Sequence, residues 1–396
     1  MITQNKTAIS ESRSLSDSEM RDLRSLTDDE LSEVLTSWGH KKYRTKQLLD
    51  WIYKKRVRSF DEMSDLSQEL RDQLGEAFQM QSLECVQEQV SQDGTVKFLW
   101  RLTDGELIES VLIPATIGQD GKRSNRHTLC VSSQVGCAYG CKFCASGIMG
   151  YRRNLEIFEI VDQVLSVERW RCNQLLESSE HTLPNGQALV NNLVIMGMGE
   201  PLANYLNLTR ALQILNAPWG LNIGARKITV STSGLVPEIR RLAEEPQQYH
   251  LAISLHGATD DVRSKIMPVN RKYPLAQLID ACEVYQKAKG RMIWIEYILI
   301  DEVNTGLEQA NALVDLVKRL QCKVNLIPYN PVEGLEWRRP SDRTVAKFRD
   351  SLHRNGVRVT VRMEKGKDID AACGQLRLKT KQKKTNQYFS RSKTMA

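Results

Sequence analysis

The spacing of hydrophobic residues changes along this chain and divides it into regions of different predicted structure. Between residues 21 and 80 the apolar residues recur every three or four positions, as in Leu31, Val34 and Leu35, which is the spacing of amphipathic helices. The polar residues 1–20 lack such a pattern and are predicted to be disordered. The sequence therefore predicts a disordered leader followed by a small all-helical domain over 21–80.

Residues 85–115 follow a strand-like pattern instead. Two apolar segments, VKFLWRL and ELIESVLIP, flank Thr103-Asp104-Gly105, which is a typical hairpin turn. We therefore expect a strand and hairpin region that links the helical domain to the rest of the chain.

From residue 127 onwards, apolar strand-like runs alternate with helical stretches. The runs cover residues 127–133, 192–198, 227–233, 250–256, 292–300 and 323–330, and a further one covers 357–364. Such alternation predicts a parallel sheet covered by helices. Six units are fewer than the eight of a closed barrel, so the predicted fold class is α/β, a partial (β/α)6 TIM-like barrel over residues 116–374.

Short polar and glycine-rich segments follow most of these strands. They are CVSSQVGCAYGCKFC, GMGEP, STSG, SLHG and IPYN. Because the carboxyl ends of parallel strands meet at one edge of the sheet, we expect these segments to line a single pocket.

Basic residues are concentrated in two segments, although the net charge of the chain is only +7. Residues 375–396 hold seven Lys or Arg and no acid, which predicts a basic tail. Residues 40–60 hold eight Lys or Arg against Asp50 alone, with four aromatic residues among them. Either segment alone also fits a solvated surface. Together they favour a polyanionic partner, since cations neutralise phosphates and aromatic rings stack on bases.

Hydropathy argues against export and against a membrane span. The first twenty residues contain no apolar core that could act as a signal peptide. The longest apolar run, MIWIEYILI, is interrupted by Glu296 and is too short to cross a bilayer. We therefore expect a cytoplasmic protein, in which nine cysteines indicate metal binding or catalysis before disulfides.

Cys137, Cys141 and Cys144 form a C-x3-C-x2-C cluster. Three thiolates this close repel one another, so a metal is expected to hold them. Zinc with Cys130 as the fourth ligand is one reading, but Cys130 lies seven residues ahead of Cys137, unlike a usual zinc knuckle. A four-iron cluster held by three cysteines would instead leave one iron open to a small molecule. This pattern is the signature of the radical S-adenosylmethionine (SAM) superfamily.

The resemblance extends to one family within that superfamily. The matching segments are TLCVSSQVGCAYGCKFC, YRRNL, GMGEPL, STSG, SLH, NLIPYN and DIDAACGQL. In this order they resemble the RlmN family, which methylates carbon-2 of adenosine in 23S ribosomal RNA (adenine 2503) and in transfer RNA (adenine 37). The resemblance implies a radical SAM barrel, with an RNA-binding helical domain containing RTKQLLDWIYKK.

The resemblance also implies a mechanism that consumes two SAM molecules for each methyl group. Cys373 would accept a methyl group from the first by displacement. A 5′-deoxyadenosyl radical from the second would take hydrogen from that S-methyl group, and the carbon radical would add to adenine. Cys130 would then attack the sulfur of Cys373 and release the product, leaving a disulfide that a reductant reopens.

The carbon-2 proton must also be removed. Glu109 matches the proposed proton acceptor of the family, and Cys130 is an alternative acceptor. Glu109 could otherwise be an outward-facing carboxylate on a strand.

The resemblance assigns the remaining site residues to cofactor binding. Cys137, Cys141 and Cys144 would hold a [4Fe-4S] cluster, one per chain. The residues that match SAM contacts are Gly199, Glu200, Ser231, Ser254, Leu255, His256 and Asn330. His256 could equally serve as a hydrogen-bonding residue of the fold. Cys85, Cys172, Cys282 and Cys322 are predicted to pack in the core.

The expected partners are 23S ribosomal RNA, transfer RNA and an electron donor such as a flavodoxin-type reductant, with the chain acting as a monomer away from membranes. Two other functions remain open. A sister group with both catalytic cysteines methylates carbon-8 of the same nucleotide and confers antibiotic resistance. A non-enzymatic RNA-binding protein with a structural zinc is the alternative from another class.

Overall fold

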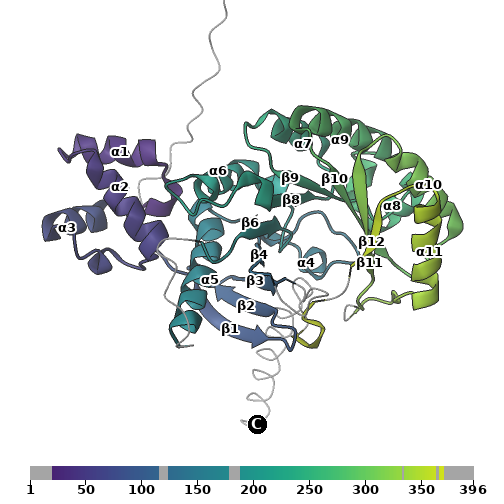
Figure 1. Ribbon diagram of the computed structural model, residues 1–396, viewed down its shortest axis with the longest axis horizontal. Coiled ribbons are helices and arrows are strands. Elements are labelled where there is room, and N and C mark those ends of the chain that lie inside the picture. The colour runs from purple at the N-terminus through teal and green to yellow at the C-terminus, as the bar shows by residue number, and fades with distance from the viewer. Residues whose placement is uncertain (1–19, 116–123, 178–187, 332–333, 363–364, 370–396) are drawn as a thin grey trace, which may run out of the picture.

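A computed structural model describes residues 20–115, 124–177, 188–331, 334–362 and 365–369. The predicted leader, Cys373 and the predicted basic tail lie outside the described residues, except for residue 20. Within the described ranges the chain forms a helical N-terminal unit and a large sheet flanked by helices (Figure 1).

The N-terminal unit consists of short helices, as the apolar spacing predicted. They are η1 (Leu23–Ser25), α1 (Asp28–Ser37), α2 (Tyr43–Leu49), the π-helical η2 (Asp50–Lys55), η3 (Phe60–Glu62) and α3 (Gln68–Ala77). A capping box begins α1: Thr27 Oγ1 accepts from Glu30 N at 3.3 Å, and Glu30 Oε2 accepts from Thr27 N at 2.9 Å. Leu31 and Leu35 are buried on one side of that helix.

Ten strands form one sheet in the order β1-β2-β3-β4-β7-β8-β9-β10-β11-β12. Their bounds are β1 Glu84–Val90, β2 Val96–Arg101, β3 Leu107–Pro114, β4 His127–Cys130, β7 Asn192–Ile195, β8 Ile228–Thr232, β9 His250–Ser254, β10 Ile293–Leu299, β11 Cys322–Pro328 and β12 Val359–Val361. Pairing is antiparallel from β1 to β4 and parallel from β4 to β12. The predicted hairpin region therefore continues the sheet of the predicted partial barrel, whose α/β class is confirmed.

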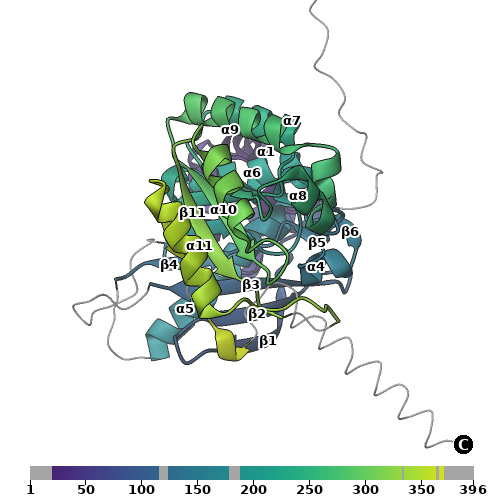
Figure 2. The same cartoon turned by 90° about the vertical axis from the view of Figure 1, so that its right-hand side faces the viewer.

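Helices cover the outer side of the parallel strands (Figure 2). They are α5 (Ile157–Glu177), α6 (Tyr205–Asn216), α7 (Val236–Glu244), α8 (Asp260–Ile266), α9 (Leu275–Lys289), α10 (Leu307–Val317) and α11 (Asp342–Arg354). The N-terminal helices lie on the opposite side of the molecule from α10 and α11 (Figure 1).

The two faces of the parallel strands differ in polarity, although each strand is a mostly apolar run in the sequence. Side chains alternate between the two faces of each strand, and those of Val230, Ile253 and Ile295 lie on the helix-covered face and are fully buried. The residues between them point the other way, and the ladder register brings polar ones together. This inner face includes Cys130, Ser231, Ser254, Glu296, Asn325 and Thr360.

Buried ion pairs join the helical unit to α5. Arg24 Nη1 donates to Asp162 Oδ1 at 2.5 Å, and Arg169 Nη2 donates to the same oxygen at 2.7 Å. Asp162 Oδ2 accepts from Leu83 N at 2.8 Å. The exposed fraction is 1% for the Arg24 side chain and 0% for that of Asp162.

A second buried pair lies further along the same helix. Arg56 Nη2 contacts Glu168 Oε2 at 2.9 Å, and Glu168 Oε1 accepts from Val190 N at 2.6 Å. Arg56 was expected to belong to an RNA-facing basic cluster, but it faces the sheet domain instead.

Among the residues that the structure describes, none of the helices combines the length and the hydropathy that a membrane span requires.

We predict that Asp162→Asn lowers the free energy of unfolding by about 3–5 kcal/mol, because Arg169 loses its buried anion and Arg24 keeps only Asp22. The native contacts lower the pKa of Asp162. Its stabilisation is therefore complete above the ordinary Asp pKa of about 3.9 and is lost as the pH falls below it. Urea denaturation at several pH values measures both effects.

Asp315→Asn is the matched control, since Asp315 pairs with Lys318 at an exposed site. It should leave the denaturation midpoint unchanged. Equal destabilisation by the two substitutions would contradict the structural role of Asp162.

Candidate active site

A cavity of about 270 Å³ opens at the carboxyl ends of the parallel strands. Eight residues that the sequence singled out line it: Cys137, Cys141, Cys144, Gly199, Glu200, Ser231, Ser254 and His256. The expectation that the strand-end segments share one pocket is met for these residues.

The cysteine segment is shaped by a small two-stranded sheet and close glycine contacts. Strand β5 (Gln134–Gly136) pairs with β6 (Tyr151–Asn154), and Cys137 N donates to Gly150 O at 3.1 Å. Gly136 has φ +74°, and a Cβ on it would lie 1.8 Å from Gly150 O. Only glycine fits there. The segment ends in the short helix α4 (Ala145–Ile148), which follows Cys144 directly.

The thiols of this segment favour a strongly cationic partner. Burial, with the Glu200 and Cys144 charges, raises the pKa of Cys137 to about 12. Burial and the neighbouring cysteines also raise the pKa of Cys141. Cys137 and Cys141 can be thiolates together only if positive charge compensates them, and an iron–sulfur cluster would supply it.

A single metal ion fits the described residues less well. No three His, Cys, Asp or Glu side chains in the described ranges converge closely enough to hold one ion. A cubane distributes its cysteine ligands over separate iron atoms, so it tolerates wider spacing. The donor set therefore fits the expected [4Fe-4S] cluster better than zinc.

Glu200 ties two strand ends together. Its Oε2 accepts from Ser233 N at 2.7 Å, and its Oε1 accepts from Leu202 N at 3.1 Å, where η4 (Pro201–Asn204) begins. Burial raises the pKa of this carboxyl. Gly199, with φ +102°, lies so close to Gln134 that a Cβ would come within 2.9 Å of Gln134 N. These residues fix the backbone that borders the cavity.

His256 makes a hydrogen bond within the fold, which is one of the two roles that the sequence left open, and it lines the cavity. Its contact with the cofactor stays a prediction. Its Nδ1 accepts from Ile298 N at 3.1 Å, so the neutral ring carries its proton on Nε2. Burial and the Arg263 guanidinium lower the pKa of His256 to about 3. The ring is therefore uncharged at neutral pH.

Arg263 is a buried cation that sequence reasoning did not identify. Its Nε donates to Leu255 O at 3.0 Å, its Nη1 to Asn270 Oδ1 at 2.8 Å, and its Nη2 to Ser233 O. It holds two strand ends in place and also lowers the pKa of Cys141, against the effect of burial.

Two predicted cofactor residues do not line this cavity. The Leu255 side chain is fully buried, and its N donates to Glu296 O at 3.0 Å. Asn330 Oδ1 accepts from Arg339 Nη1 at 2.9 Å.

Glu109 and Cys130 lie on the adjacent strands β3 and β4, next to the cavity. Glu109 is 3% exposed and pairs with Lys97 Nζ at 3.6 Å, so it is not an outward-facing carboxylate. Burial raises the pKa of Cys130 to about 11, and Glu109 adds to this shift, whereas Arg362 and the Met196 backbone oppose it. Arg362 and Met196 line the cavity.

The other described cysteines carry free thiols. Cys282 is buried, as predicted, and Cys172 and Cys322 are partly buried. The prediction is wrong for Cys85, which is exposed because β1 is the edge strand of the sheet.

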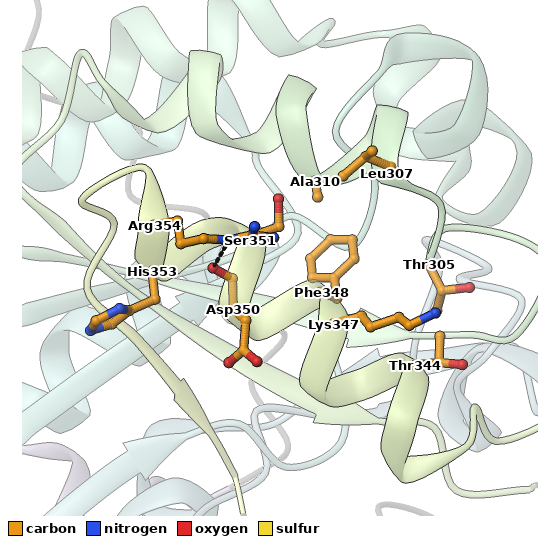
Figure 3. Close-up of a pocket in the computed structure, with 10 residues that line it drawn as sticks. All are labelled: Thr305, Leu307, Ala310, Thr344, Lys347, Phe348, Asp350, Ser351, His353 and Arg354. Carbon is orange, nitrogen blue, oxygen red and sulfur yellow. Dashed lines mark hydrogen bonds between the residues drawn. The ribbon is translucent and has the colours of Figure 1, made fainter.

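A larger cavity of about 870 Å³ lies between α10 and α11 (Figure 3). Lys347, Phe348 and Arg354 line it, together with Leu307 and Ala310 from the facing helix. It contains none of the predicted site residues. The smaller cavity is therefore the candidate active site.

Comparisons with known proteins match both parts of the chain. The model of the ribosomal RNA large subunit methyltransferase N-terminal domain matches residues 21–80, and the radical SAM superfamily model matches residues 131–313. A solved radical SAM methyltransferase from Sphaerobacter thermophilus superposes with a TM-score of 0.81 at 43% identity, covering 90% of this chain and 98% of that one.

Whole-length relatives agree with these matches. A protein of Akkermansia muciniphila named probable dual-specificity RNA methyltransferase RlmN is 51% identical over 91% of this chain and 96% of its own length. The dual-specificity RNA methyltransferase RlmN of Campylobacter fetus is 44% identical over 91% of this chain and 99% of its own length.

We predict that Cys141→Ala abolishes the iron content of anaerobically purified protein, which should otherwise approach about four atoms per chain. The broad absorbance near about 400 nm, typical of such clusters, should disappear with it. Metal analysis and absorbance spectra measure both. Cys85→Ala is the control and should keep the iron, because Cys85 is exposed on β1. Stoichiometric zinc in a colourless wild-type protein would contradict the cluster.

Proposed function

The chain belongs to the RlmN family of dual-specificity radical SAM RNA methyltransferases, and we propose on this basis that it methylates carbon-2 of adenine 2503 in 23S ribosomal RNA and of adenine 37 in transfer RNA. The observation that carries the proposal is the combination of an RlmN N-terminal domain over residues 21–80 with three cysteines at one cavity of a radical SAM domain.

The cavity supports the cofactor assignment. Cys137, Cys141 and Cys144 would hold the [4Fe-4S] cluster, and the strand ends around Glu200 and Ser254 would surround SAM. Together these groups supply one-electron chemistry that can functionalise an aromatic carbon without a nucleophilic lone pair.

Two further cysteines would transfer and release the methyl group. Cys373, which lies outside the described residues, would carry the methyl group as a thioether. Cys130 would attack the sulfur of Cys373 as a thiolate, so that a Cys130–Cys373 disulfide forms as the bond from Cys373 to the product carbon breaks. That carbon keeps the electron pair of the bond and takes up a proton to become the methyl group. The position of Cys130 beside the cavity supports this role. An external electron donor, such as a flavodoxin-type reductant, would restore the thiols.

Of the two candidate proton acceptors, Glu109 is better supported. Burial raises the pKa of Cys130, and its proposed attack on Cys373 requires this thiol to give up a proton rather than to accept one. Glu109 is buried on the neighbouring strand beside the Lys97 ammonium. We therefore assign the removal of the carbon-2 proton to Glu109.

The N-terminal unit offers basic surface for RNA, with less aromatic stacking surface than its sequence suggests. Tyr43 is 56% exposed, and the Arg44 guanidinium lies 4.9 Å from its ring centroid. Trp51 and Tyr53 are buried in the core of the unit. Tyr43 and the surrounding Lys and Arg side chains are the groups that would contact RNA.

We predict that the iron-loaded protein with SAM and a reductant forms 2-methyladenosine in both 23S ribosomal RNA and transfer RNA. Mass spectrometry of digested RNA, with the position on the base resolved, measures the product. Cys373→Ala is the control and should keep its iron, cleave SAM slowly and methylate nothing. Formation of 8-methyladenosine would replace the proposal with the carbon-8 alternative.

We predict that Cys130→Ala accumulates a covalent protein–RNA adduct, because no thiol remains to release the methylated base. A nuclease-sensitive smear above the free protein on a denaturing gel would reveal it. The double variant Cys130→Ala/Cys373→Ala should give a single sharp band. The same sharp band from Cys130→Ala alone, under conditions in which wild type turns over, would refute the resolving role.

A further inference from the structure

A row of polar side chains crosses the inner face of the sheet at one level. The strand register pairs Ser254 with Glu296, Glu296 with Asn325, and Asn325 with Thr360. Paired residues of parallel strands point to the same face. The row therefore extends over β9, β10, β11 and β12, and its first two members line the candidate active site.

Glu296 is held in this row through one of its two oxygens. Asn325 Nδ2 donates to Glu296 Oε1 at 2.9 Å, and Thr360 Oγ1 donates to Asn325 Oδ1 at 2.6 Å. The threonine hydroxyl thus orients the amide, and the amide orients the carboxylate. Such a chain pre-organises the carboxylate before any ligand arrives.

The second oxygen of Glu296 has no hydrogen-bond partner among the described residues. The residue is only 4% exposed, and it borders the cavity. Leaving a buried carboxylate oxygen without a donor is costly, so native proteins rarely do so without a ligand or ion to complete the site. Oε2 therefore indicates a donor supplied from within the cavity.

The surroundings restrict what that donor can be. Ile298 and Ile327 follow Glu296 and Asn325 two positions further along their strands and offer apolar surface to a flat ring. The Ser254 hydroxyl, beside Glu296, can bond a second polar group next to the first. A carboxylate with one free oxygen beside a hydroxyl suits the vicinal hydroxyls of a ribose, a group that acidic residues recognise in other nucleotide sites.

We propose that Glu296 is a further SAM-binding residue, which accepts a hydrogen bond from a ribose hydroxyl of the cofactor, and that Asn325 and Thr360 are positioning residues for its carboxylate. The inference rests on the proposed function, because it requires SAM in this cavity. Burial raises the pKa of Glu296, and the Asn325 hydrogen bond and the charges of Arg362 and Lys323 oppose this shift.

The test is isothermal titration calorimetry on the anaerobic, iron-loaded full chain, with SAM and its 2′,3′-dideoxyribose analogue as ligands. Glu296→Gln should weaken SAM binding about tenfold or more, the usual cost of losing a charged hydrogen bond. The dideoxy analogue should bind wild type about tenfold more weakly than SAM does. The affinity of this analogue should fall by less than about twofold from wild type to Glu296→Gln, because the analogue lacks the hydroxyls that Glu296 would bind.

Glu302→Gln is the matched control, since Glu302 is exposed just after the same strand. It should bind both ligands as wild type does. If Glu296→Gln does not fold, Thr360→Val is the second test variant. Thr360 is exposed, and its hydroxyl only orients Asn325, so this substitution should leave the fold intact. It should weaken SAM binding about threefold and spare the analogue.

Equal affinity of wild type and the folded Glu296→Gln for SAM would overturn the inference, as would an equal loss for both ligands. Reduced RNA binding with unchanged SAM binding would reassign the carboxylate to the RNA. Failure of iron-loaded wild type to bind SAM at all would instead refute the proposed function, so the two failures are distinguishable.

Discussion

The structure depends on charged and amide side chains that are buried along a single helix, α5. Asp162 and Glu168 bind arginines of the N-terminal unit, whereas Gln163 bonds Ser110 of the hairpin and the backbone of Ser132. Buried groups of this kind add little net stability over apolar packing, but they are costly when any partner is missing. They therefore specify one arrangement of helical unit, hairpin and cysteine segment.

A similar logic applies at the other end of the strands. Arg263 binds backbone carbonyls of two neighbouring strand ends, and Glu200 binds backbone amides of two. Each ion is satisfied mainly by peptide groups, so the cavity wall is held by groups that need not rearrange when a ligand enters. The side chains of Ser231, Ser254 and Glu296 line the cavity that this framework borders.

Periodicity and spacing were sufficient for the α/β class, the helical unit and the cysteine cavity, because these depend on local pattern and on the common edge of parallel strands. Of the polar inner face, Glu296, Asn325 and Thr360 were missed, since apolar residues on the helix-covered side dominate each strand. In the sequence, Glu296 was noted only as a break in an apolar run. A carboxylate inside such a strand was the signal that could have indicated a polar face. The roles of Arg56 and Lys97 could not be predicted, because their partners Glu168 and Glu109 are set by tertiary contacts. Leu255 and Asn330 were assigned by motif position, which does not fix side-chain direction.

The buried pairs between Arg24, Arg56 and α5 also bear on how the proposed RNA substrates would be held. Moving the helical unit would break these desolvated ion pairs at a high cost, so they favour one separation between the basic surface and the cavity. Any nucleic acid held at both places must span that same interval. Ribosomal and transfer RNA differ in overall architecture, so the proposed dual specificity would require both to present the same local shape across this interval.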